Sequence, residues 1–491
     1  MFDALFTTTT EYKKLSHALS GKGACALFGL PASGRAQVYA ALCRQLDKPL
    51  CIVTPGEAEA TRFAADLNTL GIPAAVFPAR DYVLRPIEGT AREYEYRRLA
   101  VLGELVGGRL RAVAVPAEAL TQFTTPKEDF CANTRTLHAG DTLLRDDLLA
   151  ALFGAGYTRR AQVDGPGQFS VRGDIVDIFA PDQKMPVRME FWGDEIDTLH
   201  TFDLTTQRRE DAIDKFYLSP AREVLFGKPA DAAEQLRAFL AKQRGKKKAA
   251  MADCMAADLD LLDGGAVPVN MDKYLAVRYP HPATVLDYFD DPILVAEEPA
   301  SIREADRATA YRRGEELKSL ILDGVLCAGL DNLYADPSYL WSKTGHYRTI
   351  CAENFARSMP DQPLKDIINA PAHTLPAWNG EVAGLLEDLK PLCDAGYTVT
   401  LLAGTDRAAA GLARDLRDKG ILVTTDAAAA PAAGLVQVLA GHLSAGCEFP
   451  FAKYALLTGR AFGETSSQKK KRKKAKDALN SLTEITPGDL V

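Results

Sequence analysis

The clearest pattern along the chain is an alternation of apolar and polar side chains within residues 168–208. At residues 187–192, one set consists of Val187, Met189 and Phe191, and the other of Arg188, Glu190 and Trp192. This period of two predicts a strand that buries one face in a core. Gly193-Asp194 follows and predicts a hairpin turn into a further strand, because glycine adopts positive φ without steric cost.

Trp192 lies beside Arg188 on the polar face of this predicted strand. Tryptophan and arginine are residues in which protein–protein binding energy is often concentrated, so the pair is compatible with a docking surface. The pattern leaves a simpler alternative open, in which Trp192 only covers the edge of a second sheet.

The rest of the chain has an α/β pattern. Apolar strands expected at 24–28, 50–53, 75–77 and 111–115 alternate with helices, which predicts a parallel sheet of the nucleotide-binding type. Residues 282–298 are expected to return to that sheet, and a short amphipathic helix is expected at 315–322. Strands at 398–402 and 421–424, with Asp406 as a helix cap between them, predict a separate α/β unit. The fold class is therefore α/β with several domains.

A glycine-containing loop follows the first predicted strand. In a phosphate loop, G-x-x-x-x-G-K-[ST], the lysine reaches the β- and γ-phosphates and the hydroxyl holds Mg²⁺. Gly29 and Gly34 keep this spacing, but Arg35 stands at the lysine position and Ala36 at the hydroxyl position. Because Ala36 offers the metal no oxygen, we expect no ATP hydrolysis and no cofactor in this chain.

Composition is typical of a cytoplasmic protein of several domains, with 491 residues, nine scattered cysteines and no C-x-x-C pair. Neither a metal site nor a membrane span is expected. Residues 469–476 hold seven of the 58 basic residues, so the remainder is more acidic than the net charge of −7 indicates. This basic run could contact nucleic acid, although a solvated linker is the simpler interpretation. The lysines at 246–248 are expected to form a solvated loop.

Three segments carry a resemblance to a known family: Arg172–Phe179, Arg188–Asp197 and Thr201–Arg208. They resemble the UvrA-binding domain that the excision-repair protein UvrB shares with the transcription-repair coupling factors. The resemblance implies that Arg172, Arg188 and Trp192 contact UvrA. The family often has phenylalanine at the position of Trp192, so the apolar anchor is kept with a different shape.

The resemblance is to the coupling factors rather than to UvrB. UvrB keeps an intact phosphate loop and inserts a long tyrosine-rich hairpin, for which residues 81–105 are too short. Glu297-Glu298 also occupies the place where active motors of the family carry Asp-Glu. The implied fold is a degenerate P-loop domain of the RecA/helicase type, interrupted by the UvrA-binding domain and followed by a small α/β domain.

The last residues resemble the opening of the domain that binds RNA polymerase in the coupling factors. Ile485, Gly488, Asp489 and Val491 match its Leu-x-x-Gly-Asp-x-Val pattern. The expectation is an N-terminal fragment without the polymerase-binding domain, the DNA-translocating motor that uses ATP and Mg²⁺, and the C-terminal regulatory domain.

The predicted domains are 1–125 and 218–350 for the discontinuous UvrB-like domain, 126–217 for the UvrA-binding domain, 351–465 for the small α/β domain, 466–482 for a basic linker and 483–491 for the start of the polymerase-binding domain. The expected function is non-catalytic recruitment of UvrA to lesions at which RNA polymerase has stalled. Two alternatives stay open: a UvrB-like ATP-dependent damage-loading subunit, and a DNA-binding adaptor that uses the basic run.

Overall fold

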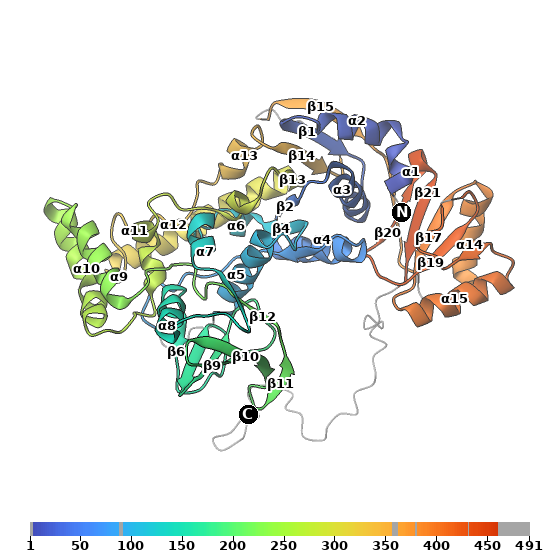
Figure 1. Ribbon diagram of the computed structural model, residues 1–491. Helices are drawn as coiled ribbons and strands as arrows, with labels where there is room; N and C mark the ends of the chain where they lie inside the picture. Colours follow the sequence, from blue (N-terminus) through green and yellow to red (C-terminus); the bar gives the residue numbers. More distant parts are fainter. Residues whose placement is uncertain (1–2, 88–91, 356–361, 379–380, 431, 460–491) are drawn as a thin grey trace, which may run out of the picture. The chain divides into compact units, whose positions relative to one another are not determined.

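A computed structural model describes residues 3–87, 92–355, 362–378, 381–430 and 432–459 (Figure 1). The chain divides into two compact units. One comprises Phe2–Thr374 with Cys447–Ala452, and the other comprises Leu375–Gly446 with Lys453–Val491 and Met1. The predicted linker at 466–482 and the predicted start of a polymerase-binding domain at 483–491 lie outside the described residues.

The larger unit is built on a parallel sheet of seven strands in the order β15-β1-β14-β13-β2-β4-β3. Its strands are β1 (Gly23–Phe28), β2 (Leu50–Thr54), β3 (Ala74–Val76), β4 (Ala112–Pro116), β13 (Ile293–Glu297), β14 (Arg348–Glu353) and β15 (Leu364–Asn369). Strands β2, β4 and β13 are buried throughout, as expected for a parallel sheet covered on both faces. The parallel sheet and the return of the chain at β13 are confirmed. The predicted boundary at residue 350 falls inside β14, so this sheet continues beyond it.

Helices precede or follow these strands in the chain. They are α1 (Asp3–Thr7), α2 (Thr10–Ala18), α3 (Ala32–Leu46), α4 (Glu57–Thr69), α5 (Glu93–Val106), α6 (Ala117–Leu120), α7 (Lys127–Ala132), α11 (Leu275–Arg278), α12 (Pro299–Leu322) and α13 (Tyr339–Lys343). The short helix expected at 315–322 is wrong, because it is only the end of the 24-residue helix α12. Two of the buried residues of α12, Asp306 and Arg313, are charged, and they hide its apolar period.

A second sheet of six strands lies between β4 and β13 in the chain, in the order β11-β10-β9-β8-β7-β6. Its strands are β6 (Thr158–Arg159), β7 (Gln168–Arg172), β8 (Ile175–Phe179), β9 (Val187–Trp192), β10 (Glu195–Phe202) and β11 (Arg209–Ala212). All neighbours are antiparallel except β6 and β7. The insertion is closed at its two ends by the antiparallel pair β5 (Arg135–His138) and β12 (Lys215–Leu218).

Helix α8 (Arg145–Gly154) belongs to the insertion. Its residues Leu148 and Leu152 join the core of the inserted sheet, together with Phe169, Val176 and Met189. The chain continues after β12 through α9 (Pro229–Ala241) and α10 (Gly245–Asp263), which share a separate core with the end of α12. The loop expected at the lysines 246–248 is wrong, because these residues lie in the first turn of α10.

The smaller unit is centred on a sheet with the order β16-β20-β21-β17-β19-β18. The strands of this sheet are β16 (His373–Leu375), β17 (Thr398–Leu402), β18 (Val423–Thr424), β19 (Val436–Leu439), β20 (Gly446–Phe449) and β21 (Tyr454–Thr458). Of these, β17, β18, β19 and β21 lie wholly in the smaller unit, together with the helices α14 (Val382–Asp394) and α15 (Asp406–Asp418). The predicted α/β unit is confirmed. The expected cap is wrong by one residue, because the Thr405 side chain accepts the hydrogen bond from the amide of Ala408.

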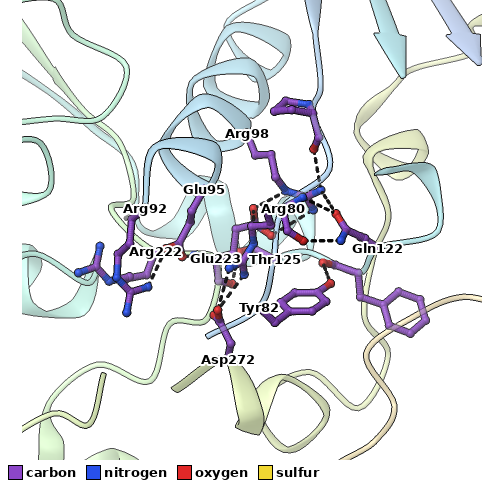
Figure 2. A network of polar contacts seen from close by, with 12 residues as sticks. Arg80, Tyr82, Arg92, Glu95, Arg98, Gln122, Thr125, Arg222, Glu223 and Asp272 are labelled. Carbon is purple, nitrogen blue, oxygen red and sulfur yellow. Dashed lines mark hydrogen bonds and ion pairs between the residues drawn. The ribbon is translucent and has the colours of Figure 1, made fainter. Parts of the chain in front are cut away.

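A network of buried ion pairs lies where the chain leaves the inserted domain (Figure 2). At its centre is Glu223, which follows β12. Its carboxylate accepts from Arg98 Nε at 2.6 Å and Arg98 Nη2 at 3.2 Å, and lies 3.3 Å from Arg80 Nε. Asp272 binds the other side of Arg80 through contacts of 2.7 and 3.1 Å. These side chains are almost completely buried.

The backbone of Glu223 belongs to the same network. Its amide donates to Glu95 Oε1 at 3.0 Å, and its carbonyl accepts from the Thr125 hydroxyl. Gln122 binds the backbone of Arg80 on both sides, since it accepts from the Arg80 amide at 3.0 Å and donates to the Arg80 carbonyl at 2.6 Å. Residues far apart in sequence are therefore fixed to one another directly beside the insertion.

Replacement of Glu223 tests this network. The variant Glu223→Gln leaves Arg98 and Arg80 buried without their shared carboxylate, so we expect the free energy of unfolding to fall by about 3–5 kcal/mol. Urea denaturation followed by circular dichroism measures the change. The matched control is Arg237→Ala, whose pair with Asp263 is half exposed, and its expected cost is below about 1 kcal/mol. Equal losses in the two variants would contradict the central role of Glu223.

The network also predicts acid sensitivity. Burial by itself raises the pKa of Glu95, but Arg80, Arg222 and Arg92 outweigh it and lower the pKa to about 2. In the unfolded chain a glutamate has a pKa of about 4.3. The stability that Glu95 contributes is therefore complete above that pH and is lost as the pH falls towards 2. We expect Glu95→Gln to flatten the decline of the free energy of unfolding between about pH 4.5 and 3. Glu304→Gln, at an exposed position of α12, should leave the decline unchanged.

Candidate functional site

The candidate interaction surface is one face of the inserted sheet. Two hairpins build it, and in each a Gly-Asp pair forms the turn: Gly173-Asp174 joins β7 to β8, and Gly193-Asp194 joins β9 to β10. Gly173 and Gly193 have φ values of 61° and 64°, which a residue with a side chain rarely adopts. The hairpin expected at Gly193-Asp194 is confirmed.

The alternation expected along β9 is also confirmed. Val187, Met189 and Phe191 are buried in the core that they share with α8. The opposite face, which we call the outer face, carries Arg172, Asp177, Arg188 and Trp192. Cross-strand register places Asp177 directly opposite Arg188, and Ile175 opposite both Arg172 and Glu190. The residues expected to contact UvrA therefore share one face.

Asp177 holds the two arginines of the outer face. Its carboxylate is completely buried and binds Arg188 through two contacts, 2.7 Å to Nε and 3.0 Å to Nη2. Arg172 Nη2 donates to the same carboxylate at 2.6 Å. One aspartate thus fixes two guanidinium groups that come from different strands.

Arg188 and Arg172 differ in exposure. Arg188 is only 9% exposed, because its Nη1 also donates to the Gln207 carbonyl at 3.1 Å and its guanidinium lies 4.7 Å from the Phe202 ring centre. The segment 203–208 therefore covers it. The side chain of Arg172 is 47% exposed and has Asp177 as its ion-pair partner, so part of its hydrogen-bonding capacity faces solvent.

Trp192 ends β9 on the outer face and is 82% exposed. It lies two residues beyond Glu190, which forms an ion pair with Arg209 of β11. One strand separates the strands of Arg172 and Trp192, so these two strands are about 10 Å apart across the sheet. The outer face consequently presents a large apolar side chain and a partly free guanidinium group on one rigid surface.

Asp177, Gln207 and Arg209 were not predicted from the sequence to be functional residues. The sequence did hold one signal for Asp177, namely a carboxylate within a mostly apolar predicted strand, next to a strand that carries an arginine. The partners Gln207 and Arg209 depend on how residues 203–208 fold back over the sheet, and a local pattern does not contain that information.

The loop at 29–36 joins β1 to α3 as expected. Gly29 has φ 86°, and a Cβ there would lie 3.1 Å from the backbone of Pro371. Arg35, on the first turn of α3, forms contacts of 3.1 Å with Glu297 and 2.8 Å with Glu298 at the end of β13. Ala36 is completely buried. The residues at the lysine position and at the end of the acidic strand are therefore brought together.

Tyr39 completes this cluster, because its hydroxyl donates to Glu297 Oε1 at 2.5 Å. Burial raises the pKa of Glu297 above its ordinary value, and Arg35 opposes that shift. Glu297 lies almost entirely out of contact with solvent, whereas the side chain of Glu298 is 34% exposed. Arg35 is thus neutralised by carboxylates of its own chain.

Two further properties concern the described residues only. No group of three or more histidine, cysteine or acidic side chains among them is arranged to hold a metal ion. Within the same ranges, no helix combines the length and the apolar character needed to cross a bilayer.

Comparison with known proteins places this geometry in a family context. The UvrB interaction domain family matches residues 136–224. The transcription-repair-coupling factor of Bacillus subtilis is 25% identical over 480 residues, which cover 95% of this chain and 40% of that protein. The Staphylococcus haemolyticus factor is 25% identical over 481 residues, and that of Staphylococcus aureus MRSA252 is 23% identical over 477, each covering 94% of this chain and 40% of the relative. The chain is therefore homologous to the N-terminal part, about 40% of the length, of the transcription-repair-coupling factors, with a UvrB interaction domain at 136–224.

Proposed function

We propose that this chain recruits UvrA through the outer face of the inserted sheet and has no catalytic activity of its own. The observation that carries the proposal is the 82% exposure of Trp192 on a face whose arginines are fixed by Asp177. An exposed tryptophan beside guanidinium groups is the composition of binding hot spots. We propose UvrA as the partner because the inserted domain resembles the UvrA-binding domain of the coupling factors.

Trp192, Arg172 and Arg188 have different roles in this proposal. Trp192 is the apolar anchor that UvrA would desolvate. Arg172 pairs with an acidic residue of UvrA through the donors that Asp177 leaves unused. Arg188 positions Asp177 and the segment 203–208, so its contribution is to keep the face rigid before binding, which lowers the entropy cost of association.

The wider process is also proposed from the resemblance. In the coupling factors, an ATP-driven motor displaces RNA polymerase that has stalled at a lesion, and UvrA then starts excision repair. The chain spans about 40% of the length of the relatives it matches, and the motor belongs to the remainder of those proteins. Contacts with RNA polymerase and with DNA through that remainder, and its use of ATP and Mg²⁺, are part of the proposal.

Titration calorimetry with purified UvrA tests the recruitment surface. Trp192→Ala is expected to raise the Kd roughly 30-fold, because loss of a hot spot costs about 2 kcal/mol or more. Arg172→Ala should raise it by a smaller factor, since that side chain stays partly hydrated. Tyr311→Ala is the matched control, because Tyr311 is a 74% exposed aromatic side chain on α12. Absence of binding by the unchanged chain would refute the proposal.

We also propose that the loop at 29–36 does not bind a nucleotide, because the internal contacts among Arg35, Tyr39, Glu297 and Glu298 occupy the groups that would bind it. Arg35 is directed to two carboxylates rather than to phosphates, and Ala36 has no group that could bind Mg²⁺. Two negative charges near the loop would also repel a triphosphate. This supports the non-catalytic function over the UvrB-like alternative.

Titration with Mg²⁺-ATP tests this second point. We expect no saturable heat at millimolar ATP, and Arg35→Ala is expected to lower stability without creating nucleotide affinity, because it leaves Glu297 buried without its counter-ion. Saturable binding of ATP by the unchanged chain would favour a UvrB-like ATP-dependent activity instead.

A further inference from the structure

A cavity of about 1140 Å³ lies within the larger unit. Its walls come from the edge of the inserted sheet around β6, from α5, and from the segments that precede α9 and follow α10. Pockets for small ligands are typically about 300–1,000 Å³, so this space suits a longer ligand. It is separate from the outer face, since β6 and β9 are divided by two strands.

Cations are concentrated on one wall of this cavity. Arg159 and Arg160 line it, are exposed, and form no ion pair or side-chain hydrogen bond with any residue that the structure describes. Lys228, before α9, is a further exposed cation of the lining. These side chains have their charge available for a ligand.

The acidic residues of the lining offset this charge only in part. Asp263 is paired with Arg237, and Asp272 is paired with Arg80. Asp164 is the remaining acidic residue among the lining residues. The cavity therefore carries more free positive than free negative charge.

The floor of the cavity adds a further positive charge. It is one edge of the buried network, where Arg92 and Arg222 are found (Figure 2). Arg92 is paired with Glu95 at 2.8 Å. Arg222 forms no ion pair among the described residues. Its Nη1 donates to the Tyr96 hydroxyl at 3.1 Å and to the backbone carbonyl of Ala221 at 2.9 Å. Four arginines of the network thus face three carboxylates, and Arg222, which interacts with Glu95 without a close ion pair, lies at the cavity.

Other parts of the lining are apolar. Phe153, Val267 and Val269 line the cavity and are 36%, 56% and 39% exposed. The Phe153 ring is supported by an edge-to-face contact with Phe169 at 5.2 Å between centres. Exposed aromatic and aliphatic surface is thereby held beside guanidinium groups, and a combination of this kind is typical of a binding site.

We propose that this cavity binds a segment of single-stranded nucleic acid. Arg159, Arg160 and Arg222 would bind its phosphates, because the planar guanidinium fork matches phosphate oxygens. Phe153 and the valines would contact base faces, which is how single strands are held without sequence readout. The site is distinct from the UvrA-binding face and from the replaced nucleotide loop, so it adds a function to the one proposed above.

Fluorescence anisotropy of a labelled oligothymidylate of about twelve nucleotides with the full chain tests this site. The variant R159A/R160A should weaken binding roughly tenfold or more and reduce the slope of log K against log salt by about 1.4, since each phosphate contact on a single strand contributes about 0.7. The two side chains have no described partners, so the fold and the UvrA titration should be unchanged. Phe153→Leu should weaken binding about fivefold while the salt slope stays constant.

Two controls separate the site from other sources of binding. Lys13→Ala/Lys14→Ala removes two exposed cations of α2 and should leave affinity unchanged. Alanine at the seven basic residues of 469–476 tests the other basic segment. Oligothymidylate binding that persists in R159A/R160A, or that is lost only when 469–476 is changed, would overturn the proposal. Displacement of the oligonucleotide by polyglutamate at equal concentration would also overturn it, in favour of an acidic peptide.

Discussion

Glu223 joins the inserted domain to the seven-stranded sheet through a single buried carboxylate. Arg98 comes from α5, Arg80 from the segment after β3, and Glu223 itself from the chain that has just left β12. A buried charge that loses its partner is strongly destabilising, so these three segments are constrained to one arrangement. The position of the insertion relative to α5, and with it the cavity around Arg222, depends on this contact.

The outer face is also organised by one buried carboxylate that two arginines share. Asp177 is buried between two arginines, and its charge is compensated only while both strands keep their register. Arg188 then holds the covering segment through Gln207. The face is consequently ordered before any partner arrives, and Trp192 is left as its exposed element. A rigid surface with one large apolar side chain loses little conformational entropy on binding.

Local patterns predicted the elements well where one signal dominated. The Gly193-Asp194 hairpin, the strands β1, β2, β3, β4 and β13 of the parallel sheet and the α/β unit at 398–424 all follow from period-two alternation, apolar runs and glycine placement. The strands β14 and β15 of the same sheet were not predicted. The prediction failed for α12, because the charged residues Asp306 and Arg313 are buried and interrupt its apolar stripe. The cap at Thr405 was missed because aspartate, the next residue, is an equally good capping residue by type. Neither failure changed the fold class.

Spacing along the chain was sufficient to predict five strands of the parallel sheet, the side of β9 on which Trp192 lies, and the altered loop with Arg35 and Ala36, since each depends on neighbours within a few positions. It could not show that Asp177 fixes both arginines of the outer face, that Arg35 contacts the two glutamates at the end of β13, or that Arg159 and Arg222 line one cavity. The contact between Arg35 and Glu298 joins residues 263 positions apart. Partners of this kind are selected by burial and charge in the folded chain, because a buried ionic group is tolerated only where three-dimensional packing brings its counter-charge to it.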